Sequence, residues 1–223
     1  MKTISTTRTT QRCPTILKFA ASVAAVVLLT ISSYHLPVQA DDTKQIETTG
    51  QVANTEQADQ TLWLLSTRSV RLNRSTSPDD PRISYHKLNA DDQWEKSDRA
   101  AFIEENDPQI PTIVFIHGNL FSQCDAINGA WPVYKRLKAA AADKPFRFVI
   151  WSWPSDMILP DPLFDVSAKA HRADVESSLL ADWLLTMPQN GKVSLLGHSL
   201  GSRMIIRALS KIDADYSAAT AEE

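Results

Sequence analysis

The sequence predicts an α/β fold with a mostly parallel sheet and flanking helices. Three short runs are mostly apolar and do not alternate with polar residues over their length, which is typical of strands buried on both faces of a parallel sheet. These runs span residues 112–116, 146–151 and 192–196. A segment with helical periodicity follows each of them, and strands that alternate with helices predict right-handed crossovers in one parallel sheet.

Two further strands are expected before these runs. Residues 61–70 contain the apolar stretch Leu62–Leu65, and residues 83–88 alternate apolar and polar side chains, as a half-exposed strand does. The polar loop between them holds Pro78 and Pro81. The charged stretch around Trp94 and Phe102 follows neither period, and no element is assigned to it.

Three helices are expected after the buried runs. The first spans 131–142, with Pro132 in its first turn, where a missing N–H costs nothing. The second spans 165–187, and Pro188 ends it. The third spans 200–212 and carries an apolar stripe at helical spacing, whereas the alanine-rich end from Ser217 resembles no strand.

Composition limits the classes of function. The chain has 223 residues, of which 43% are apolar and 22% charged, so it is long enough for one domain and excludes a wholly disordered or collagen-like protein. Residues 1–40 hold four basic and no acidic side chains, which leaves 19 basic and 26 acidic groups in the rest. An acidic body argues against nucleic acid as a partner. Two cysteines, Cys13 and Cys124, provide no disulfide framework, and we interpret Cys124 as a small buried side chain.

The first 40 residues are expected to be a signal peptide. A basic start precedes the apolar run Phe19–Ile31, which is shorter than the roughly twenty residues that a membrane-spanning helix needs. Val38-Gln39-Ala40 has small residues where a signal peptidase requires them, so the chain is expected to be exported. The alternative is an uncleaved N-terminal anchor, the one membrane contact expected. Residues 41–60 are polar and are expected to form a flexible lead-in to a domain at 61–223.

One pentapeptide carries the chemistry. The run 192–196 leads directly into Gly197-His198-Ser199-Leu200-Gly201, and a helix follows at once. This is the G-x-S-x-G nucleophile elbow in its required context of strand, sharp turn and helix. Ser199 is the candidate nucleophile, the glycines leave room in the tight turn, and the backbone N–H of Leu200 faces developing negative charge at a helix N-terminus.

A second element agrees with the elbow. The run 112–116 ends in His117-Gly118-Asn119-Leu120. The loop after this strand supplies the other oxyanion donor in an α/β-hydrolase, and the backbone N–H of Asn119 is the candidate. The alternative is an ordinary glycine turn.

At these residues the chain resembles the α/β-hydrolase superfamily. Val114–Asn119, Trp151-Ser152-Trp153-Pro154-Ser155 and Leu195–Arg203 are similar to the poorly characterised serine-esterase branch, often labelled as a domain of unknown function. The resemblance covers about residues 61–212. It implies hydrolysis of a small-molecule ester or similar acyl bond through an acyl-enzyme on Ser199. It implies no cofactor and no metal.

The expected catalytic base and acid are missing. The family order is Ser, acid, His, yet no histidine follows Ser199, and Asp213 and Asp215 come too early for the acid. We expect His117 to order its loop and the His198 side chain to point away from the hydroxyl. The chain therefore represents a partial α/β-hydrolase fold with its C-terminal strands missing, which leaves an open edge on strand 192–196.

Three explanations remain open: an interrupted gene, a stable short form that binds rather than catalyses, and a second polypeptide that completes the sheet. A truncated, weakly active or inactive serine hydrolase is favoured over a non-catalytic binding protein on the same scaffold. Trp151 and Trp153 end a strand and face one side, where they line an acyl pocket or pack in the core.

Overall fold

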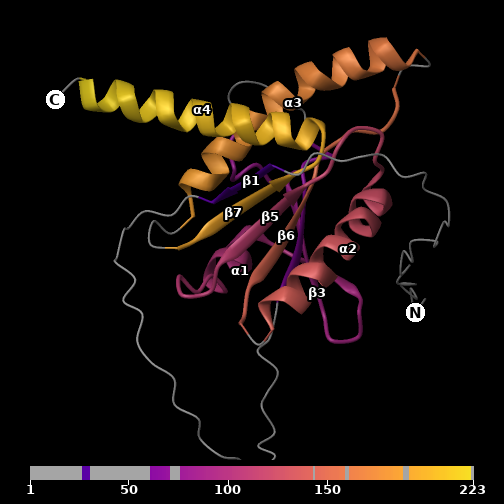
Figure 1. The fold of residues 1–223 in the computed structure, drawn as a ribbon, viewed down its shortest axis with the longest axis vertical. Coiled ribbons are helices and arrows are strands. Elements are labelled where there is room, and N and C mark those ends of the chain that lie inside the picture. Colours follow the sequence, from indigo (N-terminus) through magenta and orange to yellow (C-terminus); the bar gives the residue numbers. More distant parts are fainter. Residues whose placement is uncertain are drawn as a thin grey trace, which may run out of the picture.

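The structure is a computed structural model that describes residues 27–30, 61–70, 76–142, 144–158, 161–187 and 191–221. Its centre is one sheet with the strand order β1-β7-β5-β6-β2-β3-β4, drawn in Figure 1. The strands are β1 (Val27–Thr30), β2 (Leu62–Ser66), β3 (Ser84–Leu88), β4 (Trp94–Ser97), β5 (Thr112–Ile116), β6 (Arg147–Ser152) and β7 (Val193–Gly197). The helices are α1 (Arg99–Glu104), α2 (Gln123–Ala141), α3 (Pro162–Leu185) and α4 (Leu200–Ala221).

The centre of the sheet is parallel. β7, β5, β6 and β2 run in one direction, so their carboxyl ends meet at one edge, which we call the carboxyl edge. β3 and β4 continue the sheet in antiparallel pairing. The six strands β2–β7 form the mixed, mostly parallel sheet that the sequence predicts, and the α/β fold class is confirmed.

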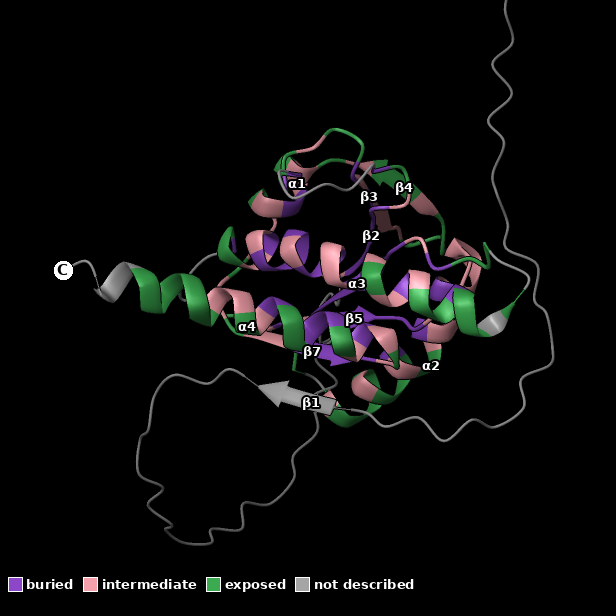
Figure 2. Ribbon diagram, turned by 90° about the horizontal axis from the view of Figure 1, so that it is seen from above, coloured by how far each residue is buried: buried purple, intermediate pink, exposed green. Residues whose placement is uncertain are grey.

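Alternate side chains of the central strands pack into two separate cores. Trp63, Val114, Val149 and Leu195 face α1, α3 and α4. Leu64, Phe115 and their neighbours on β6 and β7 face α2. This arrangement explains why the central strands are apolar without alternation, because both of their faces are covered. Figure 2 shows the buried central strands beneath α3 and α4.

The boundaries of three elements differ from the prediction. α2 begins at Gln123 rather than Trp131, because Ser122 and Asp125 form a reciprocal capping box that starts the helix two turns earlier and leaves Pro132 inside it. α4 continues to Ala221, so the alanine-rich end is helical. The unassigned stretch contains β4 and then α1, which Asp98 caps by accepting from the N–H of Ala101.

The edge of β7 is not open in the structure. Val27–Thr30, from the apolar run of the expected signal peptide, pairs with β7 in antiparallel register. In the full chain an apolar segment of the same chain therefore occupies the edge that we expected to be open. For a chain that begins at Asp41 and lacks this segment, the open edge stays a prediction. Cleavage after Ala40 stays a prediction, since residues 31–60 lie outside the described residues.

Candidate functional site at the carboxyl edge

Ser199 lies on a sharp turn between β7 and α4. Its φ angle is +54°, in the left-handed region that a residue with a side chain rarely adopts. The N–H groups of Gly201 and Ser202 donate to the carbonyls of His198 and Ser199 at 2.9 and 3.0 Å. Ser199 is exposed at the tip of the turn. This is the strained strand-turn-helix geometry that defines a nucleophile elbow.

The two glycines of the elbow are required by space. A Cβ on Gly197 would lie 2.6 Å from the backbone N of Ser202, and a Cβ on Gly201 would lie 2.8 Å from the carbonyl O of His117. Both obstacles are backbone atoms, which a side-chain rotation cannot move away. The close approach fixes the first turn of α4 against the end of β5, as the sequence predicts for glycines on either side of the serine.

The loop after β5 lies directly against the elbow. His198 donates its backbone N–H to the carbonyl of Ile116 at 3.0 Å, and a Cβ on Gly118 would lie 3.1 Å from the Cβ of Ser199. Asn119 follows Gly118. Among the hydrogen bonds of the described residues, none uses the backbone N–H of Asn119 or of Leu200. The structure thus brings together the two segments that hold the candidate oxyanion donors.

His117 is fully buried and uses both ring nitrogens to hold this loop. Its Nδ1 lies 2.9 Å from the carbonyl O of Gly118, and its Nε2 accepts the backbone N–H of Trp153 at 3.2 Å. Burial lowers the pKa of His117 to about 3. A histidine that is neutral and has both nitrogens engaged has no free position for the Ser199 proton. The interpretation of His117 as a loop-ordering residue fits this geometry.

None of the other described histidines is bonded to Ser199. The His198 ring lies against Phe121, with centroids 6.3 Å apart. His171 is exposed on α3, and His86 lies on β3, beyond β6 and β2. Asp213 and Asp215 are exposed on α4. In the part of the chain that the structure describes, the Ser199 hydroxyl therefore makes no hydrogen bond to a base, and none of these groups completes a catalytic triad.

Arg68 is a residue at this edge that sequence reasoning missed. It follows β2, and its guanidinium donates to Ser152 Oγ at 2.8 Å, Asp156 Oδ2 at 2.5 Å and the carbonyl O of Phe121 at 2.8 Å. Burial is the main reason why its pKa lies below the ordinary value, and Asp156 opposes the shift. Arg68 thereby joins the ends of β2 and β6 to the loop after β5. A single arginine after a strand gives no sequence signal for this role.

A second missed group is the buried pair Asp165 and Lys169 near the start of α3. Both side chains are 1% exposed, and their charged atoms lie 3.7 Å apart. Asp165 also accepts from Asn119 Nδ2 at 3.3 Å and from the backbone N–H of Ile158 at 2.8 Å. The i,i+4 spacing of opposite charges is visible in the sequence, but an exposed helix pair has the same spacing. Only the fold shows that this pair is buried beside the candidate oxyanion loop.

Trp151 and Trp153 are completely buried. Trp151 packs against Trp183 at a centroid distance of 5.5 Å, and Trp153 donates its indole N–H to the carbonyl of His117 at 2.9 Å. Because their large rings fill the core beneath α3, the two tryptophans do not line an acyl pocket. Of the two alternatives that the sequence left open, core packing is the one that the structure shows. Cys124 is half-buried and disulfide-bonded, so its interpretation as a small buried side chain is also wrong. The other cysteine, Cys13, lies outside the described residues.

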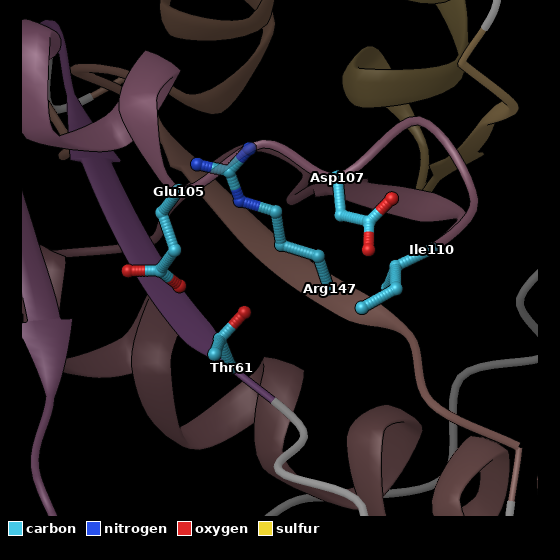
Figure 3. Close-up of a pocket in the computed structure, with 5 residues that line it drawn as sticks. All are labelled: Thr61, Glu105, Asp107, Ile110 and Arg147. Carbon is cyan, nitrogen blue, oxygen red and sulfur yellow. The ribbon is translucent and has the colours of Figure 1, made fainter.

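A small hollow of about 100 Å³ lies at the opposite edge of the sheet, near the starts of β2, β5 and β6, which we call the amino edge. Thr61, Glu105, Asp107, Ile110 and Arg147 line it, as Figure 3 shows. It is remote from Ser199, because the elbow lies where the parallel strands end.

Within the described ranges, no cluster of side chains is suited to a metal ion. No helix in the same ranges has the length and apolar character to cross a bilayer.

The comparisons with known proteins place this geometry in a family. A family model described as an alpha/beta hydrolase of unknown function (DUF900) matches residues 94–221, more than half of the chain. The matched part includes the loop after β5, the end of β6 and the elbow. No curated protein and no solved structure matches the chain. The chain therefore belongs to the DUF900 family of α/β-hydrolases of unknown function.

Proposed function

We propose that the chain is a serine hydrolase of esters or similar acyl bonds, with Ser199 as the acyl acceptor. The backbone N–H groups of Asn119 and Leu200 form the oxyanion hole. Gly197 and Gly201 allow the turn, and His198 packs beside the loop. The observation that carries the proposal is the positive φ of an exposed Ser199 whose Cβ lies against Gly118.

The chemistry follows from this arrangement. The Ser199 oxygen attacks the carbonyl carbon, the ester C–O bond breaks, and the hydroxyl proton passes to the departing alcohol. Water then cleaves the acyl-serine bond and releases the acid. Two backbone donors aimed at the carbonyl oxygen stabilise the negative charge that develops in each step, and removal of one such donor costs about 10²- to 10³-fold in related chemistry.

The absence of a base bonded to Ser199 among the described residues predicts weak activity. Oxyanion stabilisation and substrate binding without a complete triad still give about 10³- to 10⁴-fold acceleration over water. The same observation supports the second candidate, a non-catalytic binding protein on this scaffold. A second polypeptide that supplies a base and further strands is a partner compatible with either candidate.

A fluorophosphonate probe separates the two candidates, because it reacts with an activated serine and reports no turnover. We expect slow labelling of the full chain at Ser199 and none in Ser199→Ala. Ser167→Ala, which removes an exposed serine of α3, is the matched control and should label as the wild type does. Labelling that survives in Ser199→Ala would remove this serine from the mechanism, and an unlabelled wild-type chain would favour the binding protein.

We also propose that the chain is exported and cleaved between Ala40 and Asp41. The basic start, the short apolar run and Val38-Gln39-Ala40 support this. N-terminal sequencing of material recovered outside the cytoplasm should begin at Asp41. A sequence that begins at Met1 in that material would support the N-terminal anchor instead.

A further inference from the structure

Large apolar side chains are exposed along one side of the candidate site. Six of the nine exposed large apolar residues in the described part of the chain lie in three segments at the carboxyl edge. We call these six the apolar rim: Leu120 (53% exposed), Met157 (62%), Ile158 (62%), Leu163 (80%), Phe164 (70%) and Val166 (45%). Single exposed apolar residues are ordinary on a protein surface, but a cluster of this kind marks a contact site.

Hydrogen bonds join the three segments of the rim into one surface. Leu120 donates its backbone N–H to the carbonyl of Ser155 at 2.8 Å. Ile158 donates its own to Asp165 Oδ1 at 2.8 Å, and Asn119 donates its side-chain amide to Asp165 Oδ2 at 3.3 Å. The loop after β5, the segment after β6 and the start of α3 are therefore held side by side.

The buried pair of Asp165 and Lys169 secures this arrangement. The Lys169 ammonium also donates to the carbonyl of Asp156. Burying two charges is costly unless both are paired and hydrogen-bonded. The hydrogen bonds of Asp165 and Lys169 therefore hold the three segments of the rim in fixed positions. Their side chains point inward on α3, and the neighbouring Leu163, Phe164 and Val166 consequently face out. Figure 1 shows the first turns of α3 extending beyond the end of the sheet.

The rim begins next to the proposed nucleophile. Gly118 lies against Ser199, and Leu120 is two residues further along the same loop. A hydrocarbon chain on the rim would thus run directly from a carbonyl held at Ser199. The rim thus starts at the loop that holds the proposed oxyanion donor Asn119.

The charge of the rim selects among apolar ligands. Segments 118–125 and 153–168 contain four aspartates, Asp125, Asp156, Asp161 and Asp165, and no lysine or arginine of their own. Arg68 pairs with Asp156 and Lys169 pairs with Asp165, so Asp125 and Asp161 form the acidic excess at the rim. Acidic groups beside the apolar side chains repel an anionic membrane or a fatty-acid carboxylate, and they leave uncharged and zwitterionic lipids as suitable ligands.

We propose that the apolar rim binds the hydrocarbon part of an uncharged or zwitterionic lipid ester and docks the protein on the surface of a lipid aggregate. This inference rests on the proposed function for its substrate class, whereas the lipid contact stands on the rim itself. Docking would deliver the ester from the aggregate to Ser199 without passage through water.

Vesicle binding tests the rim independently of catalysis. The full chain carrying Ser199→Ala is sedimented with phosphatidylcholine vesicles, alone and combined with Phe164→Asp or Leu163→Asp. We expect each aspartate to lower the partition constant about tenfold, because an exposed apolar side chain that inserts into lipid is replaced by a charge. Ile206→Asp, at a side chain 51% exposed on α4, is the matched control and should bind as the parent does. The N-terminal segment is the same in all variants.

Distinct outcomes separate the two proposals. Equal binding by Phe164→Asp, Leu163→Asp and Ile206→Asp overturns the rim as a lipid contact. Loss of self-association in the rim variants, with vesicle binding unchanged, would make the rim a protein interface and also overturn it. Rim-dependent vesicle binding by a chain whose serine the fluorophosphonate never labels would sink the hydrolase proposal alone.

Discussion

The two ends of the central strands are built in opposite ways. At the carboxyl edge, Ser199 has a strained backbone, two backbone N–H groups lack partners in the described part of the chain, and apolar side chains face solvent. At the amino edge, Arg147 is 3% exposed and fills the space between β6 and α1. It donates to Asn106 Oδ1 at 2.9 Å and to the carbonyl of Phe102, and it lies 3.5 Å from the centre of the Phe102 ring.

This difference indicates that the amino edge contributes mainly to the stability of the fold, whereas the carboxyl edge holds the groups that react. At the amino edge, the Arg147 guanidinium beside the small hollow donates two hydrogen bonds, and its Nε has no partner in the described part of the chain (Figure 3). The carboxyl edge holds strain and unsatisfied donors in place through Arg68, His117 and the pair of Asp165 and Lys169. Variants at the amino edge should therefore change stability, and variants at the elbow should change reactivity first.

The largest effect is expected from Gly201→Ala. The new Cβ would collide with backbone oxygens at the end of β5, so the elbow must shift away from the candidate oxyanion loop. We expect the rate of fluorophosphonate labelling at Ser199 to fall more than about 100-fold, the cost of one lost oxyanion donor. Ala214→Ser, at an exposed position further along α4, is the control. Unchanged labelling in Gly201→Ala would show that the close contact is not needed.

Acid should destabilise the carboxyl edge through His117. Burial holds its pKa at about 3, below the ordinary value of 6.5. Between pH 6.5 and 3 the unfolded chain binds a proton that the folded chain refuses, so stability is full above pH 6.5 and falls by up to about 5 kcal/mol as the pH drops to 3. Urea unfolding at pH 7, 5 and 4 measures this loss. His117→Gln should have a flatter pH profile, and an equally steep one would assign the loss to other groups.

Arg147→Met should lower stability without altering the elbow. The substitution leaves the carbonyl of Phe102 and the amide of Asn106 without their donor, which costs about 3 kcal/mol in the free energy of unfolding. Below the new melting temperature, the rate of labelling at Ser199 should equal that of the wild type. Arg136→Met removes an exposed arginine of α2 and should leave stability nearly unchanged. A matching fall in labelling would mean that the two edges are coupled.

The smallest effect concerns Glu176, a fully buried carboxyl on α3 that accepts from Thr67 Oγ1 at 2.8 Å. Burial raises its pKa from 4.5 to about 7, and the bond from Thr67 opposes the rise. Its contribution to stability is therefore complete below pH 4.5 and is lost as the pH rises to about 7. Glu176→Gln, uncharged at every pH, should be more stable than the wild type by about 3 kcal/mol at pH 8 and equal to it at pH 4.5.

Chemical unfolding at the two pH values checks this prediction. Glu104→Gln replaces an exposed carboxyl of α1 and is the matched control, with little change at either pH. A less stable Glu176→Gln at pH 8 would show that the ionised carboxylate is favourable in its site.

Local patterns predicted most of the fold because the strands are short, apolar and separated by amphipathic helices. Each run from 112–116 onward became a strand within one or two residues of its expected position. The start of α2 was misplaced because Pro132 is a strong local signal for a first turn, whereas the capping box of Ser122 and Asp125 acts eight residues earlier. The partner of β7 was not predictable, because pairing depends on which distant segment reaches the edge and not on β7 itself.

The sequence by itself determined the elbow, since Gly197-His198-Ser199-Leu200-Gly201 between a strand and a helix restricts the backbone through contacts of neighbouring residues. It also determined that the central strands are covered on both faces. Only the tertiary structure decided that His117 has no free nitrogen, that Trp151 and Trp153 are core, and that six exposed apolar side chains gather at the edge of the sheet that holds Ser199. The physical reason is that hydrogen-bond partners and burial come from segments far apart in the chain, here β2, β5, β6 and α3, which the parallel sheet brings together at one edge.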